Sequence, residues 1–147
     1  MILRSFSAKI CVSFICVGLC TCNRIHKGEQ LSSAEIAQIT ALGLLDKDET
    51  VYQFYSNFKG VAGAGNFYTN KRIAHYWHYQ NDRQIDFAYY QDIAHISPTL
   101  HPMGDFTIPF LTVVRKDSTR FRFYVDGDTD EVTAFFSNCR THWQAGK

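Results

Sequence analysis

The sequence predicts a mainly β fold: a seven-stranded antiparallel barrel or sandwich, capped by a C-terminal amphipathic helix and preceded by a short helix. Between residues 50 and 125, short β-branched and aromatic runs alternate with polar turn residues, which is typical of an antiparallel meander. After them, apolar residues recur at helical spacing as far as Trp143. With 147 residues, 46% of them hydrophobic, the chain has the size of one domain.

The first 22 residues have the features of a secretory signal peptide. Arg4 and Lys9 lie in a short basic segment, and residues 10–19 are almost continuously apolar. An apolar stretch of about ten residues is too short for a permanent membrane-spanning helix, which needs roughly twenty. The sequence therefore predicts export.

The end of this segment resembles the signal of bacterial lipoproteins. In that signal, a leucine-type residue three positions before a cysteine and a small residue next to it direct cleavage and acylation of the cysteine. Cys22 has Leu19 and Thr21 at these positions, and we predict Cys22 as the acylated residue. Cys20 is the alternative, although the bulky Leu19 precedes it directly. The resemblance implies a lipoprotein of the cell envelope, anchored in the membrane by acyl chains. Without acylation the protein would be secreted, and without cleavage its N-terminus would be retained.

The predicted organisation is a signal peptide over residues 1–22, a polar linker over residues 23–31 and a single domain over residues 32–147. The whole chain carries 15 Lys+Arg against 14 Asp+Glu, and loss of Arg4 and Lys9 with the signal peptide leaves 13 against 14. This near-neutral balance predicts no nucleic-acid partner. It also predicts that any membrane contact comes from the anchor, with a local surface patch as the secondary alternative.

The domain begins with a short helix. Ser32 and Glu35 form a capping-box pattern, in which each side chain can bond the other residue's backbone N–H. Ile36 and Ile39 then share one face, and Gly43 supplies a residue suited to a left-handed C-terminal cap.

Seven strands are expected next. Their separators are polar turns and one longer loop with two prolines, at residues 98–104. The last run shows the alternation of a strand with one buried face, since Phe121 and Phe123 alternate with Arg122 and Tyr124. The expected strands are residues 51–58, 66–69, 72–79, 84–90, 93–96, 107–115 and 119–125.

The closing helix is the best defined element. Asp128 or Thr129 can cap its start, and Glu131 lies in the first turn, where a negative charge favours the helix dipole. One wide apolar stripe follows, formed by Val132, Phe135, Phe136, Cys139 and Trp143. Such a helix must cover apolar surface, so we expect it to close one end of the barrel. Cys139, on this stripe, is expected to be an inert core thiol.

A seven-stranded meander followed by one amphipathic helix is the element order of the pleckstrin-homology (PH) superfold. Residues 65–77, in which Thr69-Asn-Lys-Arg72 leads into an aromatic strand, resemble a segment of bacterial PH-like and GRAM-like domains. The resemblance covers residues 44–143 and implies a PH-like domain. In phosphoinositide-binding relatives the loop between the first two strands carries several Lys and Arg residues. The corresponding loop here, residues 59–66, has one basic residue, Lys59. The sequence therefore predicts no inositol-phosphate site.

No cluster of residues predicts catalysis, a metal or a cofactor. His75 and His78 lie three apart, which places them on opposite faces of a strand, and His95 and His101 come from other segments. No Cys or Glu at ligand spacing accompanies them. We therefore predict a protein that is not an enzyme and that holds no metal and no cofactor.

The chain has more tyrosines than one small core needs. Tyrosine is favoured at interfaces because its large apolar ring carries a polar hydroxyl. The hypothesis is an exposed patch that binds a protein or peptide, for instance along a sheet edge. Its expected members are Tyr76, Tyr79, Tyr89, Tyr90 and Tyr124. The function that follows is a membrane-anchored binding or scaffold module. The alternatives are a lipocalin-like carrier of a small ligand, which needs an open aromatic cavity, and a small envelope enzyme.

Overall fold

The computed structural model describes residues 24–57, 59–100 and 108–147. The predicted signal peptide, with Cys20 and Cys22, lies outside the described residues, as does His101. Within the described ranges, no helix has both the length and the apolar character needed to cross a bilayer.

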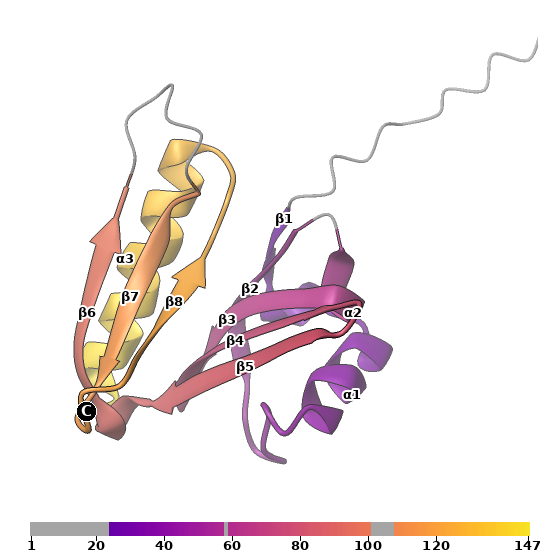
Figure 1. Ribbon diagram of the computed structural model, residues 1–147, viewed down its shortest axis with the longest axis horizontal. Coiled ribbons are helices and arrows are strands. Elements are labelled where there is room, and N and C mark those ends of the chain that lie inside the picture. Colours follow the sequence, from indigo (N-terminus) through magenta and orange to yellow (C-terminus); the bar gives the residue numbers. More distant parts are fainter. Residues whose placement is uncertain (1–23, 58, 101–107) are drawn as a thin grey trace, which may run out of the picture.

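Two antiparallel sheets and three α-helices make up the described fold (Figure 1). The first sheet has the strand order β1-β2-β3-β4-β5, and the second has the order β6-β7-β8. The elements are β1 (Arg24–Lys27), η1 (Gly28–Gln30), α1 (Ser33–Ala41), β2 (Val51–Ser56), α2 (Gly60–Gly63), β3 (Ala64–Thr69), β4 (Arg72–Tyr79), β5 (Asp82–Tyr89), η2 (Tyr90–Asp92), β6 (Ile93–Thr99), β7 (Phe110–Arg115), β8 (Arg120–Tyr124) and α3 (Thr129–Ala145).

The predicted elements are confirmed, and their ends shift by a few residues. The seven expected strands are β2 to β8, and the two expected helices are α1 and α3. The capping box of α1 is present: the Ser32 N–H donates to Glu35 Oε2 at 2.8 Å, and the Glu35 N–H donates to Ser32 Oγ at 3.3 Å. Asp128 caps α3 by accepting from the Asp130 N–H at 3.0 Å.

The predicted linker is wrong over residues 24–30. Residues 24–27 form β1, which pairs with β2 in the register Arg24↔Ser56 to Lys27↔Gln53, and η1 follows at once. The segment is too short and polar to show a strand period, so its pairing depends on the free edge of β2. Ile25 packs against the larger core cluster. Residues 24–30 therefore belong to the fold.

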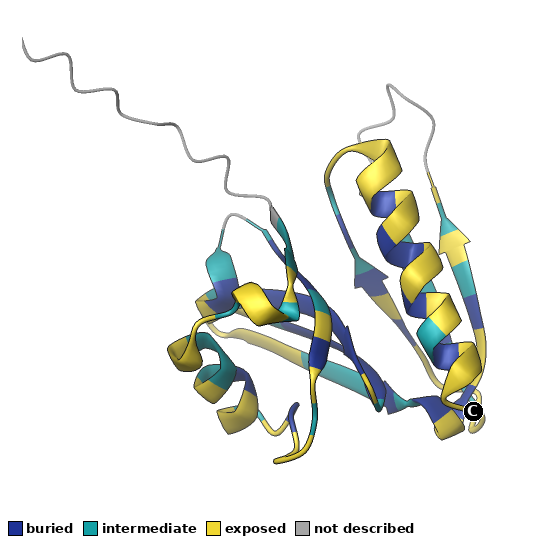
Figure 2. Cartoon of the chain, turned by 180° about the vertical axis from the view of Figure 1, so that it is seen from behind, coloured by how far each residue is buried: buried dark blue, intermediate teal, exposed yellow. Residues whose placement is uncertain are grey.

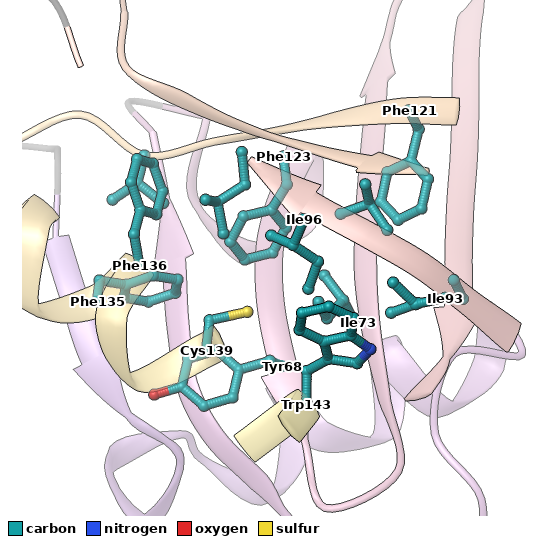
Figure 3. Packing of buried hydrophobic residues seen from close by; sticks show 14 of the residues in the cluster. Tyr68, Ile73, Ile93, Ile96, Phe121, Phe123, Phe135, Phe136, Cys139 and Trp143 are labelled. Carbon is teal, nitrogen blue, oxygen red and sulfur yellow. The ribbon is translucent and has the colours of Figure 1, made fainter. Parts of the chain in front are cut away.

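The larger core lies between the second sheet, α3 and one face of the first sheet (Figure 3). The predicted stripe of α3 is buried in full, and Cys139 lies within it. Phe135 of the stripe contacts Tyr68 and Phe123 from the two different sheets, with ring centroids 5.4 and 5.7 Å apart. Helix α3 thus closes one end of the β-structure, as expected. Burial raises the pKa of the Cys139 thiol far above its ordinary value, which makes this thiol unreactive.

A second cluster covers the opposite face of the first sheet, where α1 and the segment after it pack (Figures 1 and 2). Ile39 and Leu44 contribute from the helical side, and Phe54 and Phe67 from the strands. With both faces covered, β3 is buried at every position. This close packing explains why residue 65 is a glycine, because a Cβ at this position would clash with the Tyr76 ring.

The turn between β3 and β4 is held by a buried ion pair. Arg72 donates from Nε to Glu49 Oε1 at 2.9 Å and from Nη2 to Glu49 Oε2 at 2.6 Å. The Arg72 and Glu49 side chains are 1% and 0% exposed, and Asp46 Oδ2 lies 2.8 Å from Nη2. The Thr69 hydroxyl also donates to Glu49. The Thr69-Asn-Lys-Arg72 motif therefore has a structural role.

Candidate binding site

A cavity of about 420 Å³ lies between the inner face of the first sheet and the end of β8. No residue of α3 lines it, so it lies away from the end of the structure that α3 closes. Its walls combine aromatic rings, side-chain amides, one histidine and one carboxylate. The lining residues are Tyr55, Asn57, Ala64, Asn66, His75, Trp77, Asp82, Gln84, Ile108 and Tyr124.

His75 has a defined hydrogen-bonded form in this wall. Asn66 Oδ1 accepts the backbone N–H of Tyr124 at 3.0 Å, which identifies this atom as the amide oxygen. The same oxygen lies 2.8 Å from His75 Nδ1, so Nδ1 must carry the proton. The neutral ring then keeps its acceptor lone pair on Nε2.

Burial fixes the charge of His75 as well. The side chain is only 6% exposed, and desolvation lowers the pKa of His75 to about 4, although the nearby Asp86 carboxylate acts in the opposite direction. His75 is therefore neutral near pH 7, and Asp82 is the one acidic residue among the described residues of the lining.

This pKa predicts an acid-dependent loss of stability. Below pH ~6.5 the unfolded chain protonates His75 while the folded chain does not, so stability falls as the pH drops from about 6.5 to about 4, by about 3 kcal/mol. His75→Asn, which keeps a donor for Asn66, should remove this part of the pH dependence. Urea unfolding at several pH values measures it. The control is His78→Asn, which replaces the exposed histidine of the same strand. If both substitutions changed the pH dependence of stability equally, the assignment of this loss to His75 would be contradicted.

A second concave surface, of about 370 Å³, lies between β6 and α3. β6 is an edge strand of the second sheet, and Pro98, which has no N–H to donate, lies near its end. Leu100, an exposed large apolar residue, follows. The groove is lined by Pro98, Leu100, Thr133, Phe136, Ser137, Arg140, Thr141 and Gln144.

The predicted tyrosine patch is wrong for two of its five members. Tyr76 is 1% exposed and its hydroxyl donates to the Val61 carbonyl at 2.6 Å. Tyr90 is 3% exposed and its hydroxyl donates to the Thr69 carbonyl. Burial raises the pKa of both phenols well above the ordinary value. These rings are core residues with satisfied hydroxyls.

The other three tyrosines have separate roles. Tyr79 is 42% exposed, and the Lys59 ammonium lies 3.6 Å from its ring centroid. The Arg72 guanidinium stacks on the Tyr89 ring, and its Cζ lies 4.5 Å from the ring centroid. Tyr124 lines the cavity, with its ring 6.2 Å from that of His75. The five tyrosines therefore do not form one exposed surface.

The histidines are not brought together. His75 is buried on the inner face, whereas His78 and His95 are exposed. Across residues 24–57, 59–100 and 108–147, no three His, Cys, Asp or Glu side chains are placed to hold a metal ion. The partner of His75 is Asn66, a residue that the sequence analysis missed. The signal was available, because the turn after Thr69 pairs Asn66 with His75 across the β3–β4 hairpin.

The fold is related to a solved structure. No protein-family model matches the sequence, and no curated protein matches it either. The structure is similar to the crystal structure of a DUF1696 family protein with a pleckstrin-homology domain from Shewanella loihica PV-4, with a TM-score of 0.50. The two chains share 15% identity over 74% of this chain and 93% of that chain. The chain therefore has a PH-like fold: antiparallel sheets with a long C-terminal helix.

Proposed function

We propose that this chain is a binding module of the cell envelope, anchored by acyl chains on Cys22, that binds an extended peptide segment of a protein partner without catalysing a reaction. The observation that carries the proposal is the free edge of β6 beside the groove along α3. An edge strand offers backbone donors and acceptors to an added strand, and a neighbouring groove can take side chains of that strand.

The chemistry of the groove indicates what kind of peptide would fit. Phe136 and Leu100 supply apolar surface, and three hydroxyls supply hydrogen bonds. Arg140 is the one charged residue among the lining residues. An extended peptide with an acidic side chain facing Arg140 and an apolar one beside Leu100 would complement this surface.

The start of the fold supports a location at the membrane. β1 begins at Arg24, two residues after Cys22, and two residues span at most about 7 Å. An acyl anchor on Cys22 would therefore hold the domain directly at the bilayer surface. Arg24 pairs with Ser56, so the anchored end is the end of β2 next to the cavity.

The surroundings of His75 support a role without catalysis. The described residues that line the cavity with His75 include no Ser, Thr, Cys or Lys that its Nε2 could activate as a nucleophile. These surroundings therefore favour binding over nucleophilic chemistry.

The peptide proposal is tested by selecting peptides from a random display library on the full chain. We expect the selected sequences to carry acidic residues and to bind the Arg140→Glu variant at least about tenfold more weakly, a loss of about 1.4 kcal/mol. Arg120→Glu, which reverses an exposed charge on β8, is the matched control and should bind as the parent does. Equal loss in both variants, or binding that neither reduces, would contradict a site at the groove.

A carrier of a small ligand is the second candidate function, and one observation favours it. Although α3 fills one end of the β-structure, the cavity at the other end has an aromatic lining and the size of a ligand site.

A further inference from the structure

We propose that the cavity between the first sheet and β8 binds a neutral, hydroxyl-rich ring with the chemistry of a sugar. Trp77 and Tyr124 would form its apolar walls, and His75 would be its buried hydrogen-bond acceptor. This site is separate from the groove at β6 and does not depend on the proposed peptide.

His75 has a hydrogen-bond acceptor that the fold does not use. His75 Nδ1 is bonded to Asn66, and Nε2 makes no hydrogen bond with the described residues. Among their buried side-chain polar atoms, only Nε1 of Trp143 has no partner, so Nε2 of His75 is not sealed in the core. It is therefore open to the cavity that His75 lines, where it would accept from a ligand hydroxyl.

The side-chain amides of half-buried Asn57 and exposed Gln84 have defined orientations. Asn57 Oδ1 already accepts the Lys59 N–H at 2.9 Å, which leaves the Asn57 NH₂ as a donor. The Gln84 NH₂ donates to Asp86 Oδ2 at 2.9 Å, which leaves the Gln84 carbonyl as an acceptor. Hydroxyl groups both donate and accept, so a polyhydroxylated ligand can satisfy both amides as well as Asp82 and His75.

Charge also limits the choice of ligand. The described residues of the lining include one carboxylate and neither lysine nor arginine. A phosphate or carboxylate entering the cavity would meet Asp82 and find no countercharge, and a desolvated anion without a partner is strongly disfavoured. The lining therefore disfavours an anionic ligand, which separates this site from one that binds phosphates.

The aromatic walls of the cavity suit a sugar ring. Trp77 and Tyr124 are half-buried, so their rings face both protein and cavity. The negative face of an aromatic ring attracts the C–H groups on one side of a sugar ring, while the sugar's hydroxyls point to the polar groups around the edge. A volume of about 420 Å³ accommodates one or two such rings.

The test uses the full chain, a glycan array with neutral and anionic saccharides, and vesicles that display a neutral glycolipid. We expect binding to at least one neutral saccharide, and the two formats distinguish a soluble sugar from a lipid-linked one. Glucose 6-phosphate should bind at least about tenfold more weakly than glucose. Absence of neutral sugar binding in both formats, or equal binding of glucose 6-phosphate, would overturn the proposal.

Variants connect the binding to this cavity. Trp77→Ala should reduce binding at least about tenfold, and Tyr52→Ala, an exposed ring that does not line the cavity, should not. Asp82 is exposed, so Asp82→Lys leaves the core intact and should raise the affinity for glucose 6-phosphate relative to glucose. Arg140→Glu should leave sugar binding unchanged and Trp77→Ala should leave peptide binding unchanged, so each proposal can fail alone. Sugar binding that is unchanged in Trp77→Ala, or a preference for glucose over glucose 6-phosphate that is unchanged in Asp82→Lys, would place the ligand elsewhere.

Discussion

Replacing Arg72 with methionine is expected to lower the free energy of unfolding by about 3 to 5 kcal/mol. The change leaves the Glu49 carboxylate buried without its two guanidinium hydrogen bonds. It also removes the Arg72 contact with Asp46 and the stacking of the guanidinium on Tyr89. An unpaired buried charge costs far more than the intact pair contributes, because the desolvation penalty is no longer offset.

A double-mutant cycle measured by urea denaturation checks this explanation. Arg72→Met and Glu49→Met should each be strongly destabilising, and the double variant should lose much less than the sum of the two. Lys71→Met removes an exposed ion pair with Asp46, at 3.7 Å, and is expected to cost less than about 1 kcal/mol. Additive losses, or an Arg72→Met loss as small as that of Lys71→Met, would contradict a buried pair.

Replacing Phe135 with alanine is also expected to cost about 3 to 5 kcal/mol. Phe135 is fully buried and joins the two sheets through Tyr68 and Phe123, so the change opens a cavity that rigid strands cannot fill. The same denaturation experiment measures the loss. Thr133→Ala, on the exposed face of α3, should change stability by less than about 0.5 kcal/mol. Similar midpoints for both variants would show that α3 does not close the β-structure.

The elements that were predictable from the sequence are those with local signals. The stripe of α3 and the alternation in β8 arise within one segment, since one face of each element packs on the core. β1 has no such signal: four polar-rich residues become a strand only because β2, more than twenty residues away, offers an edge. The fold was therefore predictable and the first strand was not.

The site was less predictable for a similar reason. The lining of the cavity comes from five strands of two sheets and the segments next to them, and no spacing in the sequence joins Asn57 to Tyr124. Composition does not show which tyrosines are buried, since buried Tyr76 and exposed Tyr79 have the same amphipathic side chain. The burial of Tyr76 depends on a carbonyl of Val61, which only the fold brings within reach. The hairpin register of Asn66 and His75 was the one part of the site that pattern reasoning could reach.

The most direct test of the proposed function is amide hydrogen exchange of the full chain with and without a selected acidic peptide. A strand added to the second sheet would bond the free edge of β6, so those amides of residues 94–97 that point away from β7 should exchange at least about tenfold more slowly with peptide bound. The open edge of β1 in the first sheet is the internal control and should be unchanged. Protection at β1 without protection at β6 would contradict peptide binding at this groove, as would unchanged exchange at both edges with peptide bound.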